Sequence, residues 1–116
     1  MSVVSINTAE HYVWGDGCDG WHLLKDASLS VIQERVPAGK SEQTHRHARA
    51  RQFFYILEGR AEMWRAGDIL VLEAGQGVEV APGVAHQFRN PFEREVVFLV
   101  ISSPTTHGDR ENLPGV

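Results

Sequence analysis

Hydrophobic residues occur along this chain in short runs that glycine- and proline-containing turns separate. β-Branched and aromatic residues dominate the runs, and no stretch keeps a helical period over three turns. The pattern predicts strands at residues 29–36, 52–57, 61–64, 69–73, 78–80 and 95–101, with a further strand that begins at residue 86. Short strands at close spacing with glycine-rich turns are typical of an all-β sandwich or barrel.

The two ends of the chain lack this pattern. The first residues, to about 25, are less regular and contain a glycine-rich loop between Trp14 and Trp21. The tail after Ser103 is polar and is predicted to be a surface extension or a mobile end. We therefore expect one domain over residues 1–116, with an irregular N-terminal segment (about 1–25) and a C-terminal extension (about 103–116).

Composition narrows the class of protein. The chain has 116 residues, 42% hydrophobic and 22% charged, which suits a single globular domain with one core. The net charge of −4 argues against nucleic acid as a partner, and no apolar run approaches the roughly 20 residues of a membrane span. Cys18 is the only cysteine, so an internal disulfide is impossible and a cytoplasmic location is expected.

Three histidines and a glutamine have a spacing that suits a metal site. His45 and His47 alternate, so in a strand both point to one face, roughly 6.8 Å apart. Gln52 lies an odd number of residues beyond His47, but a connection at 48–51 would restore its phase in a new strand. His86 opens a further strand after a proline–glycine turn signal. These strands can aim all four side chains at one point.

The residues around these four positions form two motifs that resemble those of the cupin superfamily. The motifs read Gly39-x5-His45-x-His47-x4-Gln52-x6-Gly59 and Gly75-x7-Gly83-x2-His86-x3-Asn90. The resemblance implies a small single-domain jelly-roll barrel (a double-stranded β-helix) with a ligand pocket inside. It also implies one divalent metal ion, with Fe, Mn, Ni, Zn and Co all open, held by His45, His47 and His86. The family has a glutamate where this chain has Gln52.

Gln52 limits what the resemblance implies. A glutamine carbonyl can bind a divalent ion, but it is neutral and donates more weakly than a carboxylate. It should weaken metal binding and leave the ion a stronger Lewis acid. The alternative is that Gln52 only forms hydrogen bonds in a pocket whose metal is weakly held or lost. Glu42 and Glu58 fall in predicted turns and are expected to face solvent, so neither replaces the missing charge.

Position along the predicted strands and spacing from the motifs suggest roles for several other side chains. We expect three to line an apolar cavity around the metal while belonging to the core: Phe54, Ile56 and Phe88. Three histidines outside any ligand spacing are assigned to surface or capping roles: His11, His22 and His107. Three arginines either contact an anionic substrate or stay solvated: Arg35, Arg51 and Arg89.

The function predicted from these residues is that of a metal-dependent enzyme acting on a small polar molecule bound inside the barrel. Oxygenase, isomerase and decarboxylase chemistry all remain open, and no catalytic residue is assigned. The alternative is a non-catalytic small-molecule-binding or sensor module with weak or no metal. A metal-free sugar-nucleotide epimerase ranks last, because Tyr55 has the opposite phase to Gln52.

The predicted strand at 52–57 is apolar on both faces, which bears on assembly. Phe53, Tyr55 and Leu57 should lie outside the barrel, where a solvated face would carry polar residues. The strand at 95–101 is apolar on both faces as well. We expect a homodimer that buries these outer faces. The alternative is that the N-terminal segment around Trp14 and Trp21 folds back over them.

Overall fold

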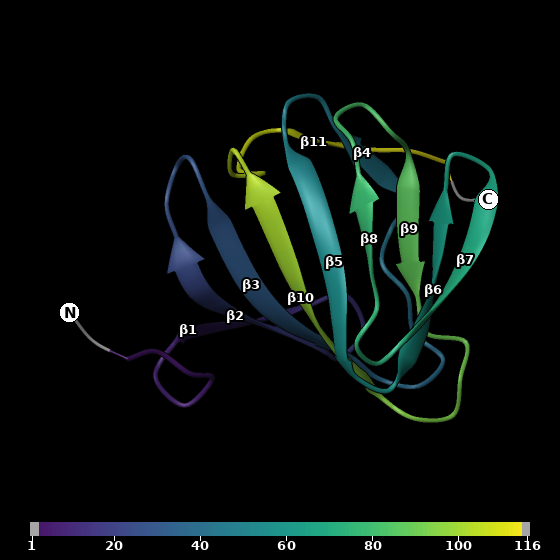
Figure 1. The fold of residues 1–116 in the computed structure, drawn as a ribbon, viewed down its shortest axis with the longest axis horizontal. Helices are drawn as coiled ribbons and strands as arrows, with labels where there is room; N and C mark the ends of the chain where they lie inside the picture. The colour runs from purple at the N-terminus through teal and green to yellow at the C-terminus, as the bar shows by residue number, and fades with distance from the viewer. Residues whose placement is uncertain (1–2, 115–116) are drawn as a thin grey trace.

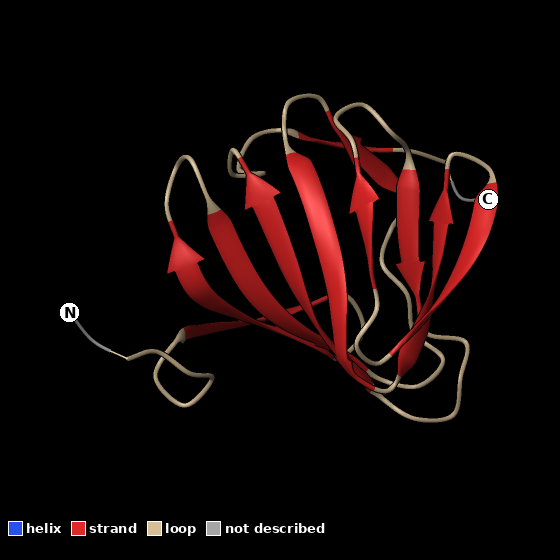
Figure 2. Cartoon of the chain, viewed as in Figure 1, coloured by secondary structure: helices blue, strands red, loops and turns tan. Residues whose placement is uncertain are grey.

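The computed structural model describes residues 3–114, which form strands and connections with no helix among them (Figure 2). Within this range eleven strands follow one another, and their bounds are β1 (Glu10–Trp14), β2 (Cys18–Lys25), β3 (Ser30–Val36), β4 (His45–His47), β5 (Arg51–Glu58), β6 (Arg60–Arg65), β7 (Asp68–Glu73), β8 (Gly77–Val80), β9 (His86–Arg89), β10 (Val96–Ser103) and β11 (Arg110–Asn112). No segment of residues 3–114 is a helix long and apolar enough to cross a membrane.

The strands form two antiparallel sheets (Figure 1). The larger sheet has the order β1-β2-β3-β10-β5-β8, and the smaller has the order β11-β4-β9-β6-β7. Neighbours in each sheet are often distant in sequence, which gives the crossed connections of a jelly roll. The prediction of an all-β fold is confirmed.

Alternation along the central strands decides which side chains enter the barrel. In β10, Val96, Phe98 and Val100 are buried, while the residues between them are half-buried on the outer side. In β5, the inward positions begin at Gln52. The connection over residues 48–50 separates β4 from β5, as the odd spacing of the polar residues requires.

Three stacked phenylalanines join the two sheets in the core. Phe88 comes from the smaller sheet, and its ring centroid lies 3.9 Å from that of Phe98 in the larger sheet. Phe54 stacks on both, at 5.9 Å from Phe88 and 6.3 Å from Phe98. Ile56 and Met63 are fully buried beside them. This aromatic cluster is the main apolar contact between the sheets.

The turn from β5 into β6 requires a glycine. Gly59 has a φ of 82°, and a Cβ there would lie 2.5 Å from the carbonyl oxygen of Glu95. Both the backbone conformation and the lack of space exclude a side chain at this position. The close approach keeps the β5–β6 hairpin against the segment that leads into β10.

The N-terminal segment is more regular than the sequence suggested. Residues 10–25 form the antiparallel pair β1 and β2, which extends the larger sheet beside β3. Tyr12 lies flat over Gly20, where a Cβ would come within 2.2 Å of the ring. This corrects the expectation of an irregular segment, which failed because the pairing partner lies outside any local pattern. Residues 1–2 lie outside the described part.

The C-terminal segment is also part of the fold. β11 pairs with β4, and Arg46 forms a two-point ion pair with Glu111. The backbone N–H of Leu113 donates to the carbonyl oxygen of Thr44. The segment lies at the surface, since all three residues of β11 are exposed, but it pairs with β4 as a strand and is not a loose end. Residues 115–116 lie outside the described range.

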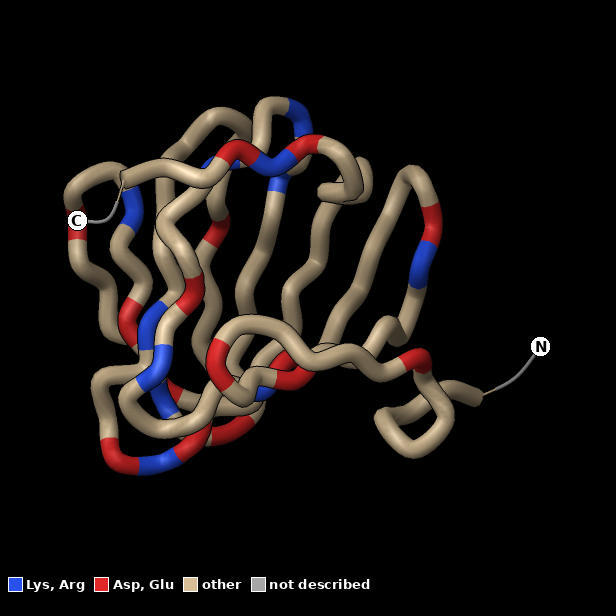
Figure 3. Tube along the Cα trace, turned by 180° about the vertical axis from the view of Figure 1, so that it is seen from behind, with Lys and Arg blue, Asp and Glu red and all other residues tan. Residues whose placement is uncertain are grey.

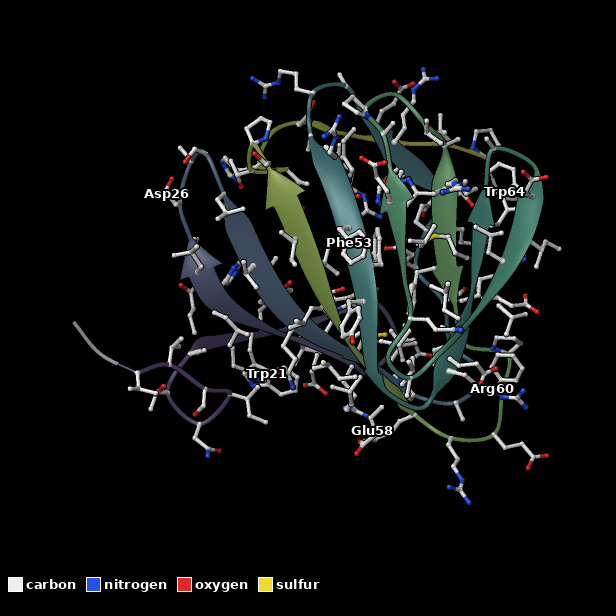
Figure 4. All side chains as sticks on the ribbon, viewed as in Figure 1. Trp21, Asp26, Phe53, Glu58, Arg60 and Trp64 are labelled. Atoms are coloured by element: carbon white, nitrogen blue, oxygen red, sulfur yellow. The ribbon has the colours of Figure 1, made fainter. Side chains whose placement is uncertain are left out.

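Part of the outer face of the larger sheet is apolar. Figure 3 shows Lys, Arg, Asp and Glu gathered mainly toward the ends of the strands, with long uncharged stretches between. Phe53, labelled on β5 in Figure 4, is 41% exposed and Leu57 is 43% exposed. Trp21 and Leu57 line a shared outer groove near the N-terminal hairpin. The hairpin therefore reaches one end of this face and leaves Phe53 exposed.

Candidate metal centre

Strand register brings three imidazoles together. His45 and His47 point inward from β4, and His86, the first residue of β9, pairs directly with His45. The ring centroid of His45 lies 4.9 Å from that of His47 and 4.3 Å from that of His86. One ring nitrogen from each of the three side chains lies within 4.8 Å of the other two. All three side chains are buried.

Backbone carbonyls orient two of these rings. His45 donates from Nδ1 to the carbonyl oxygen of Gln43 at 2.7 Å, and His86 donates from Nδ1 to that of Val84 at 3.0 Å. Because a carbonyl only accepts, Nδ1 carries the proton and Nε2 keeps its lone pair. Nε2 of His86 and Nδ1 of His47 are buried and have no hydrogen-bond partner among residues 3–114.

Burial keeps the three imidazoles neutral. It lowers the pKa of His45 to about 3 and that of His86 to about 4, because the cation loses its hydration inside the barrel. The pKa of His47 is lowered for the same reason. Neutral imidazoles with free lone pairs are the form that binds divalent metals.

Gln52 faces the cavity from the opposite sheet. Its Nε2 donates to the hydroxyl of Ser102 at 3.2 Å, and the two residues are paired across β5 and β10. Its Oε1 is buried and lacks a hydrogen-bond partner within the described chain. A free amide oxygen of this kind can accept a hydrogen bond or bind a cation.

A cavity of about 220 Å³ lies beside these side chains. Residues from both sheets, the N-terminal hairpin and the C-terminal segment line it: Tyr12, Trp14, Ile32, Glu34, Glu42, His45, His47, Gln52, Phe54, Val100, Ser102, Thr106 and Arg110. Phe54 is thus a wall of the cavity, as expected from its phase. Ile56 and Phe88 do not line it but belong to the core. The volume suits a small molecule of a few heavy atoms.

Glu42 lines this cavity, and the prediction that it faces solvent was wrong. Its side chain is only 10% exposed, and Oε1 accepts a hydrogen bond from the Phe88 N–H at 2.9 Å. Burial raises the pKa of Glu42 to about 8. The residue is drawn inward because Ser41 forms an isolated bridge with Arg89, which ties this connection to β9. Glu58 is exposed, as predicted.

A second buried carboxyl group, Glu34, was missed. Burial raises its pKa to about 7, although the hydrogen bond from the Tyr12 hydroxyl to Oε2, 3.0 Å long, opposes the shift. The available signal was the phase of the predicted strand at 29–36, since Glu34 alternates with Ile32 and Val36 on the inward side. Tyr12 itself could not be found because β1 was not predicted.

The three arginines considered as either anion contacts or solvated residues do not line the cavity. Ion pairs hold each of them: Arg35 with Asp19 and Glu95, Arg51 with Glu79, and Arg89 with Glu62. The arginine that lines the cavity is Arg110 of β11. None of the other described histidines joins the triad: His11 contacts Asp19, His22 stacks on Tyr12, and His107 is exposed.

The donor set fits a divalent cation. Three neutral imidazole nitrogens and a free amide oxygen are ligands that first-row divalent metals accept. Two carboxyl groups lie on the same cavity, where they can exchange protons with a bound molecule. The outward phase of Tyr55 leaves it off the cavity wall, so it is not the acid of an epimerase site.

Comparison with known proteins agrees with this architecture. Residues 32–102 match the family model described as a cupin domain. The sequence is 27% identical over 93 residues to an uncharacterized protein of Methanocaldococcus jannaschii. The aligned region covers 79% of this chain and 74% of that protein.

Solved structures give the same result for the fold. An RmlC-like cupin from Shewanella frigidimarina superposes with a TM-score of 0.83 at 24% identity, over 93% of this chain and 95% of that chain. A predicted oxalate decarboxylase from Thermotoga maritima superposes with a TM-score of 0.82 at 19% identity, over 90% and 100%. At these identities the likeness establishes the fold alone, and the jelly-roll prediction is confirmed.

Proposed function

The chain belongs to the cupin superfamily, and from that premise we propose that it holds one divalent metal ion at His45, His47 and His86. The observation that carries the proposal is the convergence of three buried imidazoles whose ring nitrogens lie within 4.8 Å of one another. Unpartnered nitrogens inside a barrel cost free energy unless a ligand satisfies them. Within the triad, the buried ring nitrogens without a hydrogen-bond partner among residues 3–114 belong to His47 and His86, and a bound divalent ion would satisfy them. Its identity stays open among Fe, Mn, Ni, Zn and Co.

Gln52 is proposed as a fourth ligand through Oε1. That atom is buried without a hydrogen-bond partner in residues 3–114. The amide nitrogen of Gln52 donates a hydrogen bond to the Ser102 hydroxyl. The bond to Ser102 therefore orients the amide with its oxygen free. Because the amide oxygen is neutral, the site has one negative charge fewer than a site with glutamate at this position. A bound ion would therefore be a stronger Lewis acid but would be held less tightly.

The proposed activity is that of a metal-dependent enzyme of the oxygenase, isomerase or decarboxylase type. A bound ion supplies Lewis acidity toward an oxygen atom of the substrate. Glu34 can accept and return a proton at Oε1, the oxygen that Tyr12 does not engage, and its pKa of about 7 suits this near neutral pH. Arg110 on the cavity wall can orient an anionic group.

The substrate class is a small polar molecule. The cavity of about 220 Å³ has room for few heavy atoms and offers imidazole, carboxyl, amide, hydroxyl and guanidinium groups. One relative of the same fold is described as a predicted oxalate decarboxylase, which supports the inclusion of small carboxylic acids among the candidates.

The test begins with protein purified without an affinity tag. Elemental analysis should find close to one transition-metal ion per chain, and a panel of small hydroxy, oxo and dicarboxylic acids should include a compound that the protein converts. Chelation should abolish that conversion and added metal should restore it. Metal-dependent binding without turnover would favour the non-catalytic binding module instead. A protein that neither retains nor takes up metal would refute the proposed function.

We also propose that two copies associate through the outer face of the larger sheet. Phe53 and Leu57 are exposed there, and Tyr55, Leu99 and Ile101 are half-buried beside them. Soluble monomers rarely expose contiguous apolar surface of this kind. Light scattering coupled to size exclusion should give a dimer mass, and Phe53→Glu should give a monomer. A wild-type monomer at micromolar concentration would contradict the proposal.

A further inference from the structure

The C-terminal strap, defined as residues 105–113, is the neighbour that holds the strand with two of the three histidines. Arg110 pairs with His47 and Asn112 pairs with His45, so the strap runs along the whole of β4 (Figure 1). On its other side, β4 pairs with β9 between His45 and His86, and the backbone N–H of Gly83 donates to the carbonyl oxygen of His47 at 2.7 Å. A three-residue strand with one such pair has little support of its own. The strap therefore supplies most of the backbone pairing of β4.

Asp109 of the strap binds the connection that follows β4. Its carboxylate accepts hydrogen bonds from three consecutive backbone N–H groups: Ala48 at 3.0 Å, Arg49 at 3.0 Å and Ala50 at 2.9 Å. The Asp109 side chain is only 4% exposed. Charge-assisted bonds from successive amides to one buried carboxylate form a rigid anion nest. The path of residues 48–50 is thus fixed by a residue about 60 positions away.

These three residues lie between two of the proposed metal ligands. His47 is the last residue of β4 in the smaller sheet, and Gln52 lies near the start of β5 in the larger sheet. The connection therefore carries the chain from one wall of the barrel to the other. The spacing of five residues gives the wrong phase for one continuous strand, and only the shape of residues 48–50 restores it. Loss of the carboxylate would leave the buried N–H of Ala50 and the partly buried N–H groups of Ala48 and Arg49 without this acceptor and release this shape.

We propose that Asp109 is a positioning residue for the metal centre, which sets the placement of His47 relative to Gln52 through the 48–50 connection. This inference rests on the proposed function, because it concerns the same metal site. Asp109 is not one of the proposed ligands; its carboxylate acts through the backbone amides of residues 48–50. The same strap contributes Thr106 and Arg110 to the cavity wall, so one segment supports both the ligands and the pocket.

The test compares Asp109→Asn with Glu111→Gln in the metal-depleted full chain titrated with Co²⁺. Asparagine keeps the shape of the side chain but loses the charge and one acceptor oxygen. Glu111 lies in the same strap and pairs with Arg46 at the surface, so Glu111→Gln disturbs the strap but not the nest. Asp109→Asn should weaken Co²⁺ binding about 10-fold, as supporting residues around a metal commonly do, and alter the visible absorption of bound Co²⁺. Glu111→Gln should match the wild type in both.

Wild-type affinity and an unchanged Co²⁺ spectrum in Asp109→Asn, with only a lower unfolding temperature, would overturn the inference, because that is what a purely structural role produces. If Asp109→Asn does not fold, Asp109→Glu takes its place, since it keeps the charge and displaces the oxygens by one methylene.

The experiment distinguishes a failure of the proposed metal site from a failure of the positioning role of Asp109. If the wild type takes up no Co²⁺, the proposed function fails, and the imidazole NMR signals of His47 in the metal-free protein decide the positioning role. Signals that shift in Asp109→Asn but not in Glu111→Gln support the role, and signals unchanged in both overturn it.

Discussion

The two ends of the barrel interior differ in what they bury. At one end, Phe54, Phe88 and Phe98 stack with centroids as close as 3.9 Å, and apolar side chains fill the space between the sheets. At the other end, imidazoles, carboxyl groups and an amide surround a cavity of about 220 Å³. The same two sheets form both ends, and Phe54 lies at the boundary between them.

The difference separates the source of stability from the source of chemistry. Close-packed aromatic rings contribute favourable transfer and dispersion energy. Buried polar atoms without partners, such as Nε2 of His86 and Oε1 of Gln52, cost about 1–3 kcal/mol each until a ligand satisfies them. The packed end therefore holds the barrel in shape while the polar end stays ready for a ligand.

The largest effect on stability should come from the packed end. Phe88→Ala removes the ring that contacts both Phe54 and Phe98, and should destabilise the protein by about 3–5 kcal/mol because a cavity replaces it. Urea denaturation gives this value. The folded variant should still bind metal, since the three imidazoles remain. A loss below about 1 kcal/mol would show that the cluster does not dominate the core.

The matched change at the polar end should reduce metal affinity strongly and stability only weakly. His47→Ala removes one proposed ligand and a buried nitrogen without a partner in residues 3–114. Metal affinity should fall more than about 100-fold, because a direct ligand matters more than the supporting residues around it. The metal-free variant should lose less stability than Phe88→Ala. Equal metal affinity in wild type and variant, measured by titration, would exclude His47 as a ligand.

The packed end was the easier one to predict from sequence. Phase along β5 and β9 identified Phe54 and Phe88 as inward, and the motif spacing gave the inward phase of His45 and His47, because both depend on the two-residue period of a strand. The odd spacing to Gln52 correctly required a break before β5. Local periodicity was sufficient for these positions. Phe98 was not identified, because the strand that carries it is apolar on both faces.

The polar end depends on contacts that local periodicity does not encode. Tyr12 reaches Glu34 only because β1 pairs with β2 over Gly20, and Arg110 reaches the cavity only because β11 pairs with β4. Glu42 turns inward because a bridge to β9 holds its connection. Each contact joins segments far apart in sequence, so the surroundings of the site could not be derived from any one of them.

A smaller effect should follow from restoring charge at the polar end. Gln52→Glu places a carboxylate beside the proposed ion and should tighten metal binding at least about 10-fold, because opposite charges attract strongly at low effective dielectric. Ser102→Ala is the control, since it removes the partner of the Gln52 amide without adding charge. Metal titration of the three proteins is the measurement. Unchanged or weaker binding in Gln52→Glu would argue against Gln52 as a ligand.

The last expected effect is a change in the pH dependence of stability. Burial raises the pKa of Glu42 from 4.5 to about 8, so the folded protein keeps a proton that the unfolded chain releases. The metal-free protein should therefore lose stability as the pH rises from about 4.5 through about 8, because the unfolded state binds fewer protons there. Glu42→Gln should remove this part of the loss, while Glu58→Gln at an exposed turn should not.

Thermal unfolding between pH 5 and pH 8.5 is the measurement. The lowered pKa values of His45 and His86, about 3 and about 4, act in the other direction below pH 6.5, where the unfolded chain gains protons that the folded protein excludes. The difference between Glu42→Gln and wild type cancels that contribution. Identical pH profiles in the two proteins would show that Glu42 is ionised in the folded state.

Anomalous X-ray diffraction from crystals of the metal-loaded protein tests directly whether His45, His47 and His86 hold a metal ion. Data collected on either side of the absorption edge of the bound metal identify both the element and its position. We expect one strong peak per chain, about 2.0–2.2 Å from a ring nitrogen of each of His45, His47 and His86. A cavity without a peak in protein that has been supplied with metal, or a peak that only surface carboxylates surround, would contradict this expectation.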